Sequence, residues 1–226
     1  LNFFIFLFSI NLFFFFIKRL YTGNPGAHKI IDNLASKMFK KEKEKRLIRG
    51  CINNDRRAQK AVYEAYFNTM YSVCRRYLKN DEDILEVLNN GFLNVFKKIS
   101  QFKGEGSFEG WIKRIIIHKS LDYIKLNKKY KEHIRLEDQV AEARDWSLDA
   151  MKMEEQEIET LIEELPDVLQ TVFNLFVVEG YSHKEISAML NINESTSRWY
   201  LLKARDQLQL ALKKNNEHNL SYHGNK

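Results

Sequence analysis

The sequence predicts an all-α protein made of two small helical domains joined by a linker. The 226 residues include only two prolines and nine glycines, so few positions interrupt a regular backbone. Leucine, isoleucine, phenylalanine and charged residues recur at spacings of three and four, which is the rhythm of amphipathic helices. A chain of this length holds one domain or two small ones, and a long acidic stretch without a helical period lies between two helical parts.

The charge distribution indicates a polyanionic partner. The formal net charge is +6 and the sequence pI about 9.1. Residues 37–60 contain ten Lys or Arg against three Asp or Glu, and residues 97–135 contain eleven against four. Residues 136–164 reverse the sign, with eleven acidic against two basic residues. Two basic blocks separated by an acidic one predict two surfaces for a polyanion and a connector that avoids it.

Residues with catalytic or metal-binding chemistry are sparse. Cys51 and Cys74 lie 23 residues apart, with no CxxC motif and no His–Cys cluster. This spacing predicts neither a zinc site nor a disulfide framework and fits a reducing cytoplasm. The six histidines are scattered, and no Ser/His/Asp, Cys/His or paired-carboxylate arrangement is evident. We therefore predict a protein that is not an enzyme and needs no metal or cofactor.

The first 37 residues do not match the rest of the chain. Residues 1–17 are strongly apolar and are followed by Lys18 and Arg19. The run is near the lower length limit for a membrane span, and a signal peptide has its positive charges before the apolar run. Three interpretations remain: an over-extended translation start, a membrane anchor, or a cleaved signal. The first is suggested by the position of the first methionine, Met38. We expect residues 1–37 to be an extension outside the fold.

Residues 45–129 are predicted to form a bundle of three or four helices. Apolar side chains, including Tyr66, Met70 and Cys74, recur at helical spacing up to residue 79, where Asn80–Asp81 interrupts the pattern. The pattern restarts over residues 83–99. Helices of this length suffice for a common core.

The next predicted helix starts at Phe108, after a loop with two glycines. On a helical wheel Arg114, His118, Lys125 and Lys128 share one sector, with Trp111 at its edge. A basic stripe edged by an aromatic ring suits a nucleic-acid strand, because cations meet phosphates and rings offer stacking faces. The alternative is a core helix with a solvated charged side. No GK[ST] follows the glycines, which excludes a nucleotide-binding loop.

Residues 83–129 resemble region 2 of bacterial RNA polymerase sigma factors of the extracytoplasmic-function (ECF) subfamily, within the sigma-70 family. The resemblance is carried by Phe-Lys-Gly-Glu-Gly-Ser-Phe at 102–108, Trp111 and Leu-Asp-Tyr at 121–123. It implies that the loop and helix open the −10 element and hold a flipped base. The DNA-binding residues implied there are Lys103, Ser107, Phe108, Trp111, Arg114, His118, Lys125 and Lys128.

The helix before this loop is implied, by the same resemblance, to dock on the coiled coil of the polymerase beta-prime subunit. The residues implied to bind core polymerase are Asp83, Glu86, Asn89, Asn90 and Phe92. The family's Gln-Glu pair reads Asn89-Asn90 in this chain, and its acidic cluster is reduced to Asp83 and Glu86. These departures bear on the strength of binding to core polymerase and not on the fold.

Residues 130–156 are predicted to be an acidic linker. They contain no glycine or proline and show no clean period. A flexible spacer is the plain interpretation. By resemblance, the segment is the linker between the two sigma domains, which in the family runs through the polymerase near the RNA path.

Residues 157–213 are predicted to form a helix-turn-helix domain. Pro166 is placed in the first turn of one helix and Gly180 at its end. Ser182 and Glu185 form the S-x-x-E pattern of a capping box, which starts a short helix. The turn at 191–193 leads into a longer helix, giving the helix-turn-helix pattern. The tail, 214–226, is polar and predicted to be disordered.

The second helix of this motif is predicted to contact base edges in the major groove through its first turns. The exposed residues there are Ser195, Thr196, Arg198, Trp199 and Lys203. Arg198 suits guanine, and the two hydroxyls suit phosphate or base. Residues 165–208 resemble sigma region 4, the reader of the −35 element. The family's Gly-Thr-Val is Ser-Thr-Ser at 195–197.

Together these features predict an alternative sigma factor that acts in the cytoplasm. The expected partners are core RNA polymerase, through its beta-prime and beta subunits, promoter DNA and an anti-sigma factor. Membrane contact is expected only if residues 1–17 are native. Two alternatives remain: a helix-turn-helix regulator outside polymerase, membrane-tethered if the apolar segment is real, and a helical adaptor that binds only protein.

Overall fold

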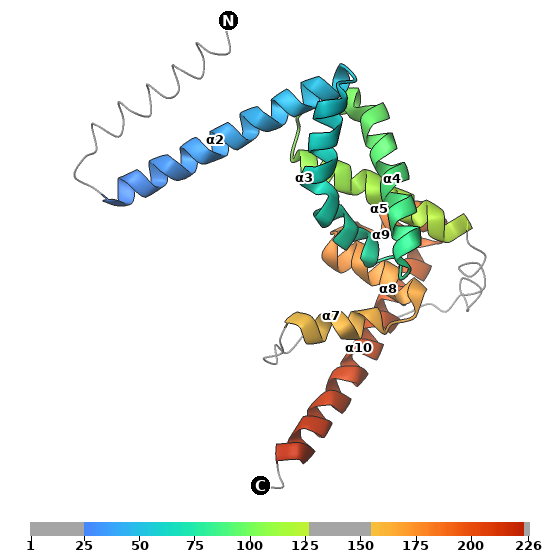
Figure 1. Cartoon of the computed structure of the whole chain (residues 1–226). Helices are drawn as coiled ribbons and strands as arrows, with labels where there is room; N and C mark the ends of the chain where they lie inside the picture. Colours follow the sequence, from blue (N-terminus) through green and yellow to red (C-terminus); the bar gives the residue numbers. More distant parts are fainter. Residues whose placement is uncertain (1–24, 127–154, 224–226) are drawn as a thin grey trace, which may run out of the picture. The chain divides into compact units, whose positions relative to one another are not determined.

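The computed structural model describes residues 25–126 and 155–223, and every regular element in these two ranges is helical (Figure 1). The helices are α2 (Pro25–Ile52), α3 (Arg56–Arg75), α4 (Asp81–Lys98), η1 (Ile99–Gln101), α5 (Phe108–Leu126), α7 (Glu155–Glu163), α8 (Asp167–Phe173), η2 (Asn174–Val178), α9 (His183–Leu190) and α10 (Glu194–His223). The predicted all-α class is confirmed. The chain divides into two compact units, residues 1–65 and 66–226, with the boundary inside α3.

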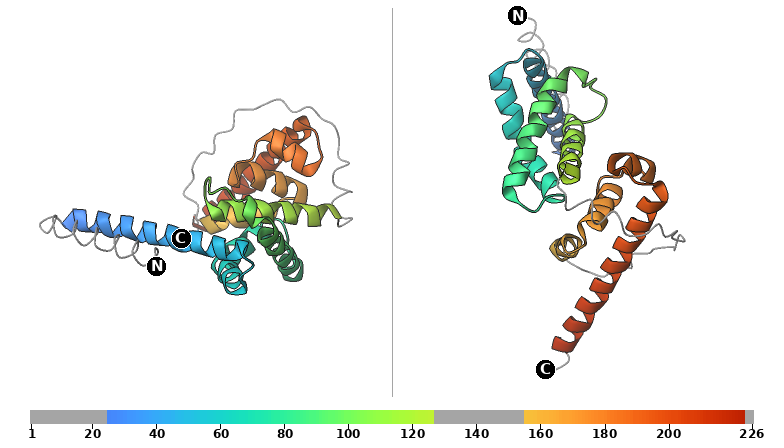
Figure 2. Two further views of the ribbon diagram at one scale, coloured as in Figure 1. Left: turned by 90° about the horizontal axis from the view of Figure 1, so that it is seen from above. Right: turned by 90° about the vertical axis from the view of Figure 1, so that its right-hand side faces the viewer.

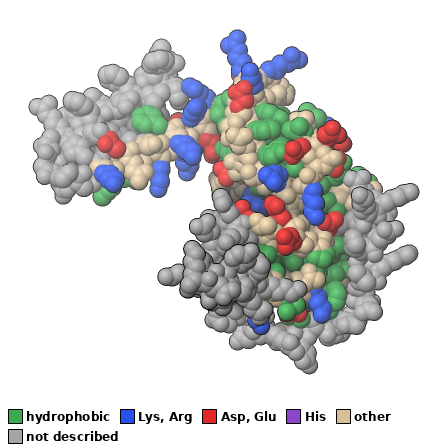
Figure 3. Space-filling view, turned by 60° about the horizontal axis from the view of Figure 1, so that its bottom comes forward, with side chains coloured by type: hydrophobic (Ala, Val, Ile, Leu, Met, Phe, Trp, Pro, Cys, Tyr) green, Lys and Arg blue, Asp and Glu red, His purple; other side chains and the backbone are tan. Residues whose placement is uncertain are grey.

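The first unit begins its described part with α2, which starts earlier than expected. Pro25 is the first helical residue, where its fixed φ and missing N–H are tolerated. Residues 25–37 are therefore helical, with Ile30 and Leu34 exposed, and the prediction that 1–37 lies outside the domain fold stays a prediction. In the view of Figure 3, Lys and Arg side chains project from both edges of α2. The apolar residues 1–17 lie outside the described ranges, so the three interpretations of that segment stay predictions.

No helix within the two described ranges is long and apolar enough to cross a membrane. The α2 helix has the length, at 28 residues, but its mean hydropathy is negative because it is rich in lysine. A span needs about 20 predominantly apolar residues.

In the second unit, α4 packs against α5, as the apolar stripes predict. The Asn80 side chain caps α4 by accepting a hydrogen bond from the Glu82 amide at 2.9 Å. Acidic residues in its first turn and Lys97 and Lys98 in its last complement the helix dipole. A Cβ at Gly91 would overlap the Ile116 side chain, so the glycine lets the two helices approach closely.

The α8, η2, α9 and α10 helices form a second group with its own core, built on Val172, Leu175, Ile186 and Ala204, all fully buried. Pro166 immediately precedes α8 as its N-cap, one position before the predicted first turn. Gly180 adopts φ +75°, the left-handed conformation that lets the chain leave η2, as predicted.

The α10 helix continues through His223 and projects past the helices against which it packs (Figure 2). The prediction of a disordered tail from residue 214 is thus wrong up to 223. No proline or glycine interrupts the chain before Gly224, so nothing in the sequence stops the helix earlier. The predicted linker, 130–156, lies outside the described residues except for the first two residues of α7.

Candidate nucleic-acid interface

The loop before α5 depends on its two glycines. Gly104 and Gly106 have φ of +80° and +79°. Residues with a side chain rarely adopt this left-handed conformation, so the loop favours glycine at both positions. The Ser107 hydroxyl accepts a hydrogen bond from the Gly110 amide at 3.0 Å and so caps the start of α5. Ser107, predicted to contact DNA, therefore already has a structural role in fixing where the helix begins.

An aromatic cluster lies under this loop. The Phe108 ring is stacked on that of Trp111, with centroids 5.9 Å apart, and both lie within 6 Å of Phe102. Tyr66 meets Phe108 edge-on at 5.7 Å. Phe108 is 1% exposed, so its predicted DNA contact is wrong, because no surface remains for a ligand. Trp111 is partly exposed, and the buried ring supports it.

The predicted basic stripe of α5 is on the outside of the helix. Arg114 and His118 are exposed, Lys125 is half-buried, and Lys103 is exposed in the preceding loop. The opposite sides bury Ile112, Ile116, Ile117 and Leu121. Lys128 lies outside the described residues. The helical wheel therefore separated the buried from the accessible side chains correctly, while their contact with DNA stays a prediction.

His118 is a neutral member of this stripe near pH 7. Burial lowers the pKa of its imidazole, and the nearby Arg114, Lys125 and Lys98 lower it further, against the opposing effect of Asp122. A neutral imidazole offers one donor and one acceptor rather than a positive charge. Arg114 and Lys125 consequently supply the charge at this surface.

The α4 surface differs from the predicted polymerase-docking set. Phe92 is 1% exposed and belongs to the core, so its predicted contact with polymerase is wrong. Asp83 accepts a hydrogen bond from the Tyr123 hydroxyl at 2.6 Å. Glu86, Asn89 and Asn90 are exposed as predicted.

Two leucines that the sequence analysis left out lie on the same helix. Leu85 is 41% exposed and Leu93 56%. They are eight residues apart with Asn89 midway, so all three share one side of α4. Their exposure could have been predicted from the sequence, because both leucines fall outside the apolar stripe of α4 that faces the core.

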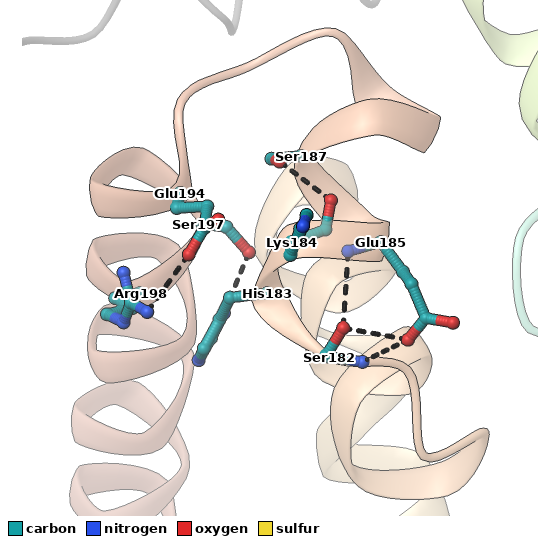
Figure 4. A network of polar contacts seen from close by, with 8 residues as sticks. All are labelled: Ser182, His183, Lys184, Glu185, Ser187, Glu194, Ser197 and Arg198. Carbon is teal, nitrogen blue, oxygen red and sulfur yellow. Dashed lines mark hydrogen bonds and ion pairs between the residues drawn. The ribbon is translucent and has the colours of Figure 1, made fainter.

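In the helix-turn-helix, α9 starts with the predicted capping box (Figure 4). The Ser182 hydroxyl accepts from the Glu185 amide at 3.3 Å, and the Glu185 carboxylate accepts from the Ser182 amide at 2.9 Å. The Glu185 carboxylate also accepts from the Ser182 hydroxyl at 2.8 Å, and the hydrogen bonds from the Ser182 amide and hydroxyl lower the pKa of this carboxyl. Asn191 ends α9 with φ +57°, a conformation that asparagine tolerates better than most residues.

A histidine–serine pair joins the two helices of the motif. Ser197 is fully buried, and its hydroxyl lies 2.9 Å from Nδ1 of His183, which also stacks on Phe176 with centroids 4.5 Å apart (Figure 4). Sequence analysis noted serine at 197 but missed His183. The hydroxyl, which would be costly to bury alone, is satisfied by the imidazole.

The first turns of α10 present the predicted readers. Ser195, Arg198 and Lys203 are exposed, and Thr196 and Trp199 are half-buried. Arg198 pairs with Glu194 one turn earlier at 3.1 Å, and the Lys203 ammonium lies 5.7 Å from the Trp199 ring. Such exposed contacts are weak, so both cations can exchange them for DNA phosphates or bases.

The pair at His183 predicts a stability that falls in acid. Burial, together with Arg198 and Arg205, lowers the pKa of His183 from its ordinary 6.5. Below about pH 6.5 the unfolded chain binds the proton that the folded one resists, so stability decreases as the pH falls. We expect the urea midpoint to drop between pH 7.5 and pH 5.5, and to drop less in His183→Gln. An equal drop in both proteins would contradict this assignment.

Comparison with known proteins identifies two sigma regions in the chain. The family model for sigma-70 region 2 matches residues 62–130, and the model for sigma-70 region 4 matches residues 155–208. The ECF RNA polymerase sigma-E factor of Haemophilus influenzae is 25% identical over 174 residues, which cover 72% of this chain and 92% of that protein. The RNA polymerase sigma-H factor of Pseudomonas aeruginosa is 22% identical over 186 residues, 77% of this chain and 96% of that protein.

The solved structures to which the chain is similar include CnrH in complex with the cytosolic domain of CnrY, at a TM-score of 0.41 and 16% identity over 74% of this chain and 96% of that one. Another is the sigma factor RpoE with the anti-sigma factor NepR from Bartonella quintana, at a TM-score of 0.43 and 14% identity over 68% and 96%. The two region models match in the order region 2, then region 4, and together cover more than half of the 226 residues. The chain belongs to the sigma-70 family of RNA polymerase sigma factors, within its ECF subfamily.

Proposed function

We propose that this ECF sigma factor directs transcription initiation by using three separate surfaces, on α4, α5 and α10. The observation that carries the proposal is that α5 lies inside the sigma region 2 match and the first turns of α10 inside the sigma region 4 match, and that both present exposed cations. The role is that of a non-enzymatic initiation factor acting on polymerase in the cytoplasm. Regulation by an anti-sigma factor follows from family membership and is part of the same proposal.

The α5 surface handles the displaced strand of the −10 element. Trp111 is half-buried and packs against the rings of Phe102 and Phe108, which leaves part of its own ring available to a flipped base. Lys103, Arg114 and Lys125 then meet the phosphates of the unpaired strand. Base stacking on an aromatic ring is sequence-tolerant and depends on a rigid platform, which the buried rings provide.

The first turns of α10 read the −35 element. Arg198 reaches guanine from the exposed side of the helix, and Ser195 and Thr196 meet phosphate or base. Lys203 lies one turn further along and suits a phosphate. The His183–Ser197 pair holds α9 against α10 and so fixes the angle at which these readers enter the groove.

The α4 surface docks on core polymerase through the beta-prime coiled coil. Glu86 and Asn90 supply polar contacts, and Leu85 and Leu93 add apolar area at the same face. Burial of apolar surface contributes about 25 cal/mol per Å². The two leucines thus compensate for part of the acidic charge that this helix has lost relative to its family.

The proposal is tested by transcription in vitro with purified core polymerase. We expect the full chain to support specific initiation, and a chain starting at Met38 to show whether the preceding residues contribute. DNA binding without transcription would indicate a regulator outside polymerase. Binding that does not weaken with salt would indicate a protein adaptor, because each phosphate contact lowers the affinity by about 0.9 log unit per log unit of salt.

Arg198→Ala is expected to reduce discrimination at the −35 element by about 1–3 kcal/mol, because a bidentate contact to guanine is lost. The measurement compares binding to promoters with intact and mutated −35 sequences. Lys203→Ala is the matched control, since loss of a phosphate contact weakens binding to both promoters alike. If Arg198→Ala discriminates between the two promoters as well as the unmutated chain does, Arg198 does not contact a base of the −35 element.

A further inference from the structure

The first half of α2 exposes a row of large apolar side chains. Ile30, Leu34 and Met38 are 64%, 52% and 48% exposed. They are four residues apart, so they lie along one side of the helix. Phe39, 37% exposed, adjoins the end of the row, and we call these four residues the α2 apolar face. A grouped apolar surface of this kind marks a site of interaction with another protein or with a membrane.

The opposite side of this stretch is polar. On a helical wheel Lys29, Ser36 and Lys40 lie about 180° from Leu34 and Met38, and all three are exposed. A helix with one apolar side and one polar side rich in lysine is typical of helices that lie in the plane of a membrane surface. Lysine opposite the apolar face favours a helix that lies along the surface rather than across it.

Positive charge accompanies the apolar face along α2. Residues 29–49 contain eight Lys or Arg against three Asp or Glu. Lys37 and Lys41 come three residues after Leu34 and Met38, so these two exposed lysines flank the apolar face. Their charge complements acidic phospholipid headgroups, and their aliphatic stems can cover apolar surface while the ammonium groups stay in water.

The C-terminal end of α2 is packed within its own unit. Ile48 is 9% exposed and Cys51 1%, whereas the apolar face precedes both. The sequence before α2 includes the strongly apolar residues 1–17, a composition that partitions into lipid. The exposed apolar side chains thus belong to the part of α2 that follows this segment in the chain.

We propose that the α2 apolar face binds the surface of a membrane that contains acidic phospholipids, with α2 lying in the plane of the interface. Leu34 and Met38 enter the boundary between headgroups and acyl chains, about 5–10 Å deep. Lys37 and Lys41 stay at the headgroups, and the polar side of the helix faces water. The contact belongs to α2 itself and goes beyond the sigma function proposed above.

A membrane fits this surface better than a protein groove does. Apolar residues and lysines recur around the same turns, so a protein partner would need an apolar groove edged by carboxylates at matching positions. A bilayer with acidic lipids supplies apolar depth beside negative charge along the whole helix. Asp32, the one acidic residue between 29 and 41, is on the polar side, where it does not oppose acidic headgroups.

The test places an environment-sensitive dye on either side of α2 in the full chain. The dye is attached to Leu34→Cys, on the apolar face, or to Ser36→Cys, the matched control on the polar side. Cys51 and Cys74 are buried, and burial raises the pKa of each thiol to about 11, so the label goes to the introduced cysteine. The probes are phosphatidylcholine vesicles with or without phosphatidylglycerol.

With phosphatidylglycerol vesicles we expect a blue shift of the emission at Leu34→Cys and none at Ser36→Cys. Without the acidic lipid, half of the shift should need at least about tenfold more lipid, because each lysine near an acidic surface favours binding about fivefold. Added to Leu34→Cys, Lys41→Gln should raise the requirement for acidic vesicles about fivefold. Lys60→Gln, an exposed change of the same charge on α3, should leave it unchanged.

No shift at Leu34→Cys, or equal shifts at both positions, would overturn the proposal. A shift that core polymerase causes without lipid would assign the α2 apolar face to a protein partner, and one that follows protein concentration alone would assign it to a second copy of the chain. Either result would also overturn the membrane contact. Transcription in vitro with core polymerase tests the sigma function independently of these outcomes.

Discussion

Replacing Phe108 with alanine is expected to destabilise the chain by about 3–5 kcal/mol. The ring is 1% exposed and contacts the rings of Tyr66, Phe102 and Trp111. Its removal leaves a cavity under the first turn of α5, where the loop with two left-handed glycines cannot collapse without losing its conformation. Since natural domains are stable by only about 5–15 kcal/mol, this single change uses a large share of the total.

The measurement is urea unfolding followed by Trp111 fluorescence in a Trp146→Phe, Trp199→Phe background, so that the signal reports on the α5 region. Phe39→Ala is the matched control, because that ring is 37% exposed on α2 and its loss is expected to cost about 0.5 kcal/mol or less. A Phe108→Ala midpoint equal to that of the control would show that the aromatic cluster does not support the helix.

The helices of this chain were predictable because their signals are local. The stripe Ile84, Leu88 and Val95 repeats with the helical period and is buried as predicted. The cap at Ser182 depends on residues three positions apart, so a short stretch of sequence contains it. The same holds for the basic side of α5, since side chains three and four residues apart share a face whatever the helix later packs against.

Contacts between distant segments were not predictable from such patterns. Phe92 and Phe108 were assigned to binding surfaces, and both are buried. One of the rings that contact Phe108 is that of Tyr66, which lies 42 residues earlier in the chain. His183 lies 14 residues before Ser197, and Glu179 lies 103 residues after Arg76, its hydrogen-bond partner at 2.7 Å. In the periodicity of the sequence, His183, Ser197, Glu179 and Arg76 are isolated polar side chains without visible partners. Their roles follow only from the tertiary contacts that pair them.

Trp111→Ala is expected to impair promoter opening about 10- to 100-fold while leaving the closed complex nearly unchanged. Loss of base stacking costs about 1–3 kcal/mol per base, and this cost arises only after the base has left the duplex. The measurement is permanganate reactivity of thymines around −10, with closed-complex binding measured in parallel. Trp111→Phe retains a ring over Phe108 and is expected to open the promoter close to normally.

The two aromatic substitutions distinguish a ring that stabilises the α5 region, Phe108, from a ring that contacts the flipped base, Trp111. Phe108→Ala acts through stability, so its loss of opening should be accompanied by a lower unfolding midpoint and by loss of the closed complex. Trp111 is only half-buried, so its removal should spare both. If Trp111→Ala gives the same permanganate reactivity as the unmutated chain, the flipped base is held by another part of the loop. Arg114 and Lys125 would then bind the phosphates of the duplex rather than those of the open strand.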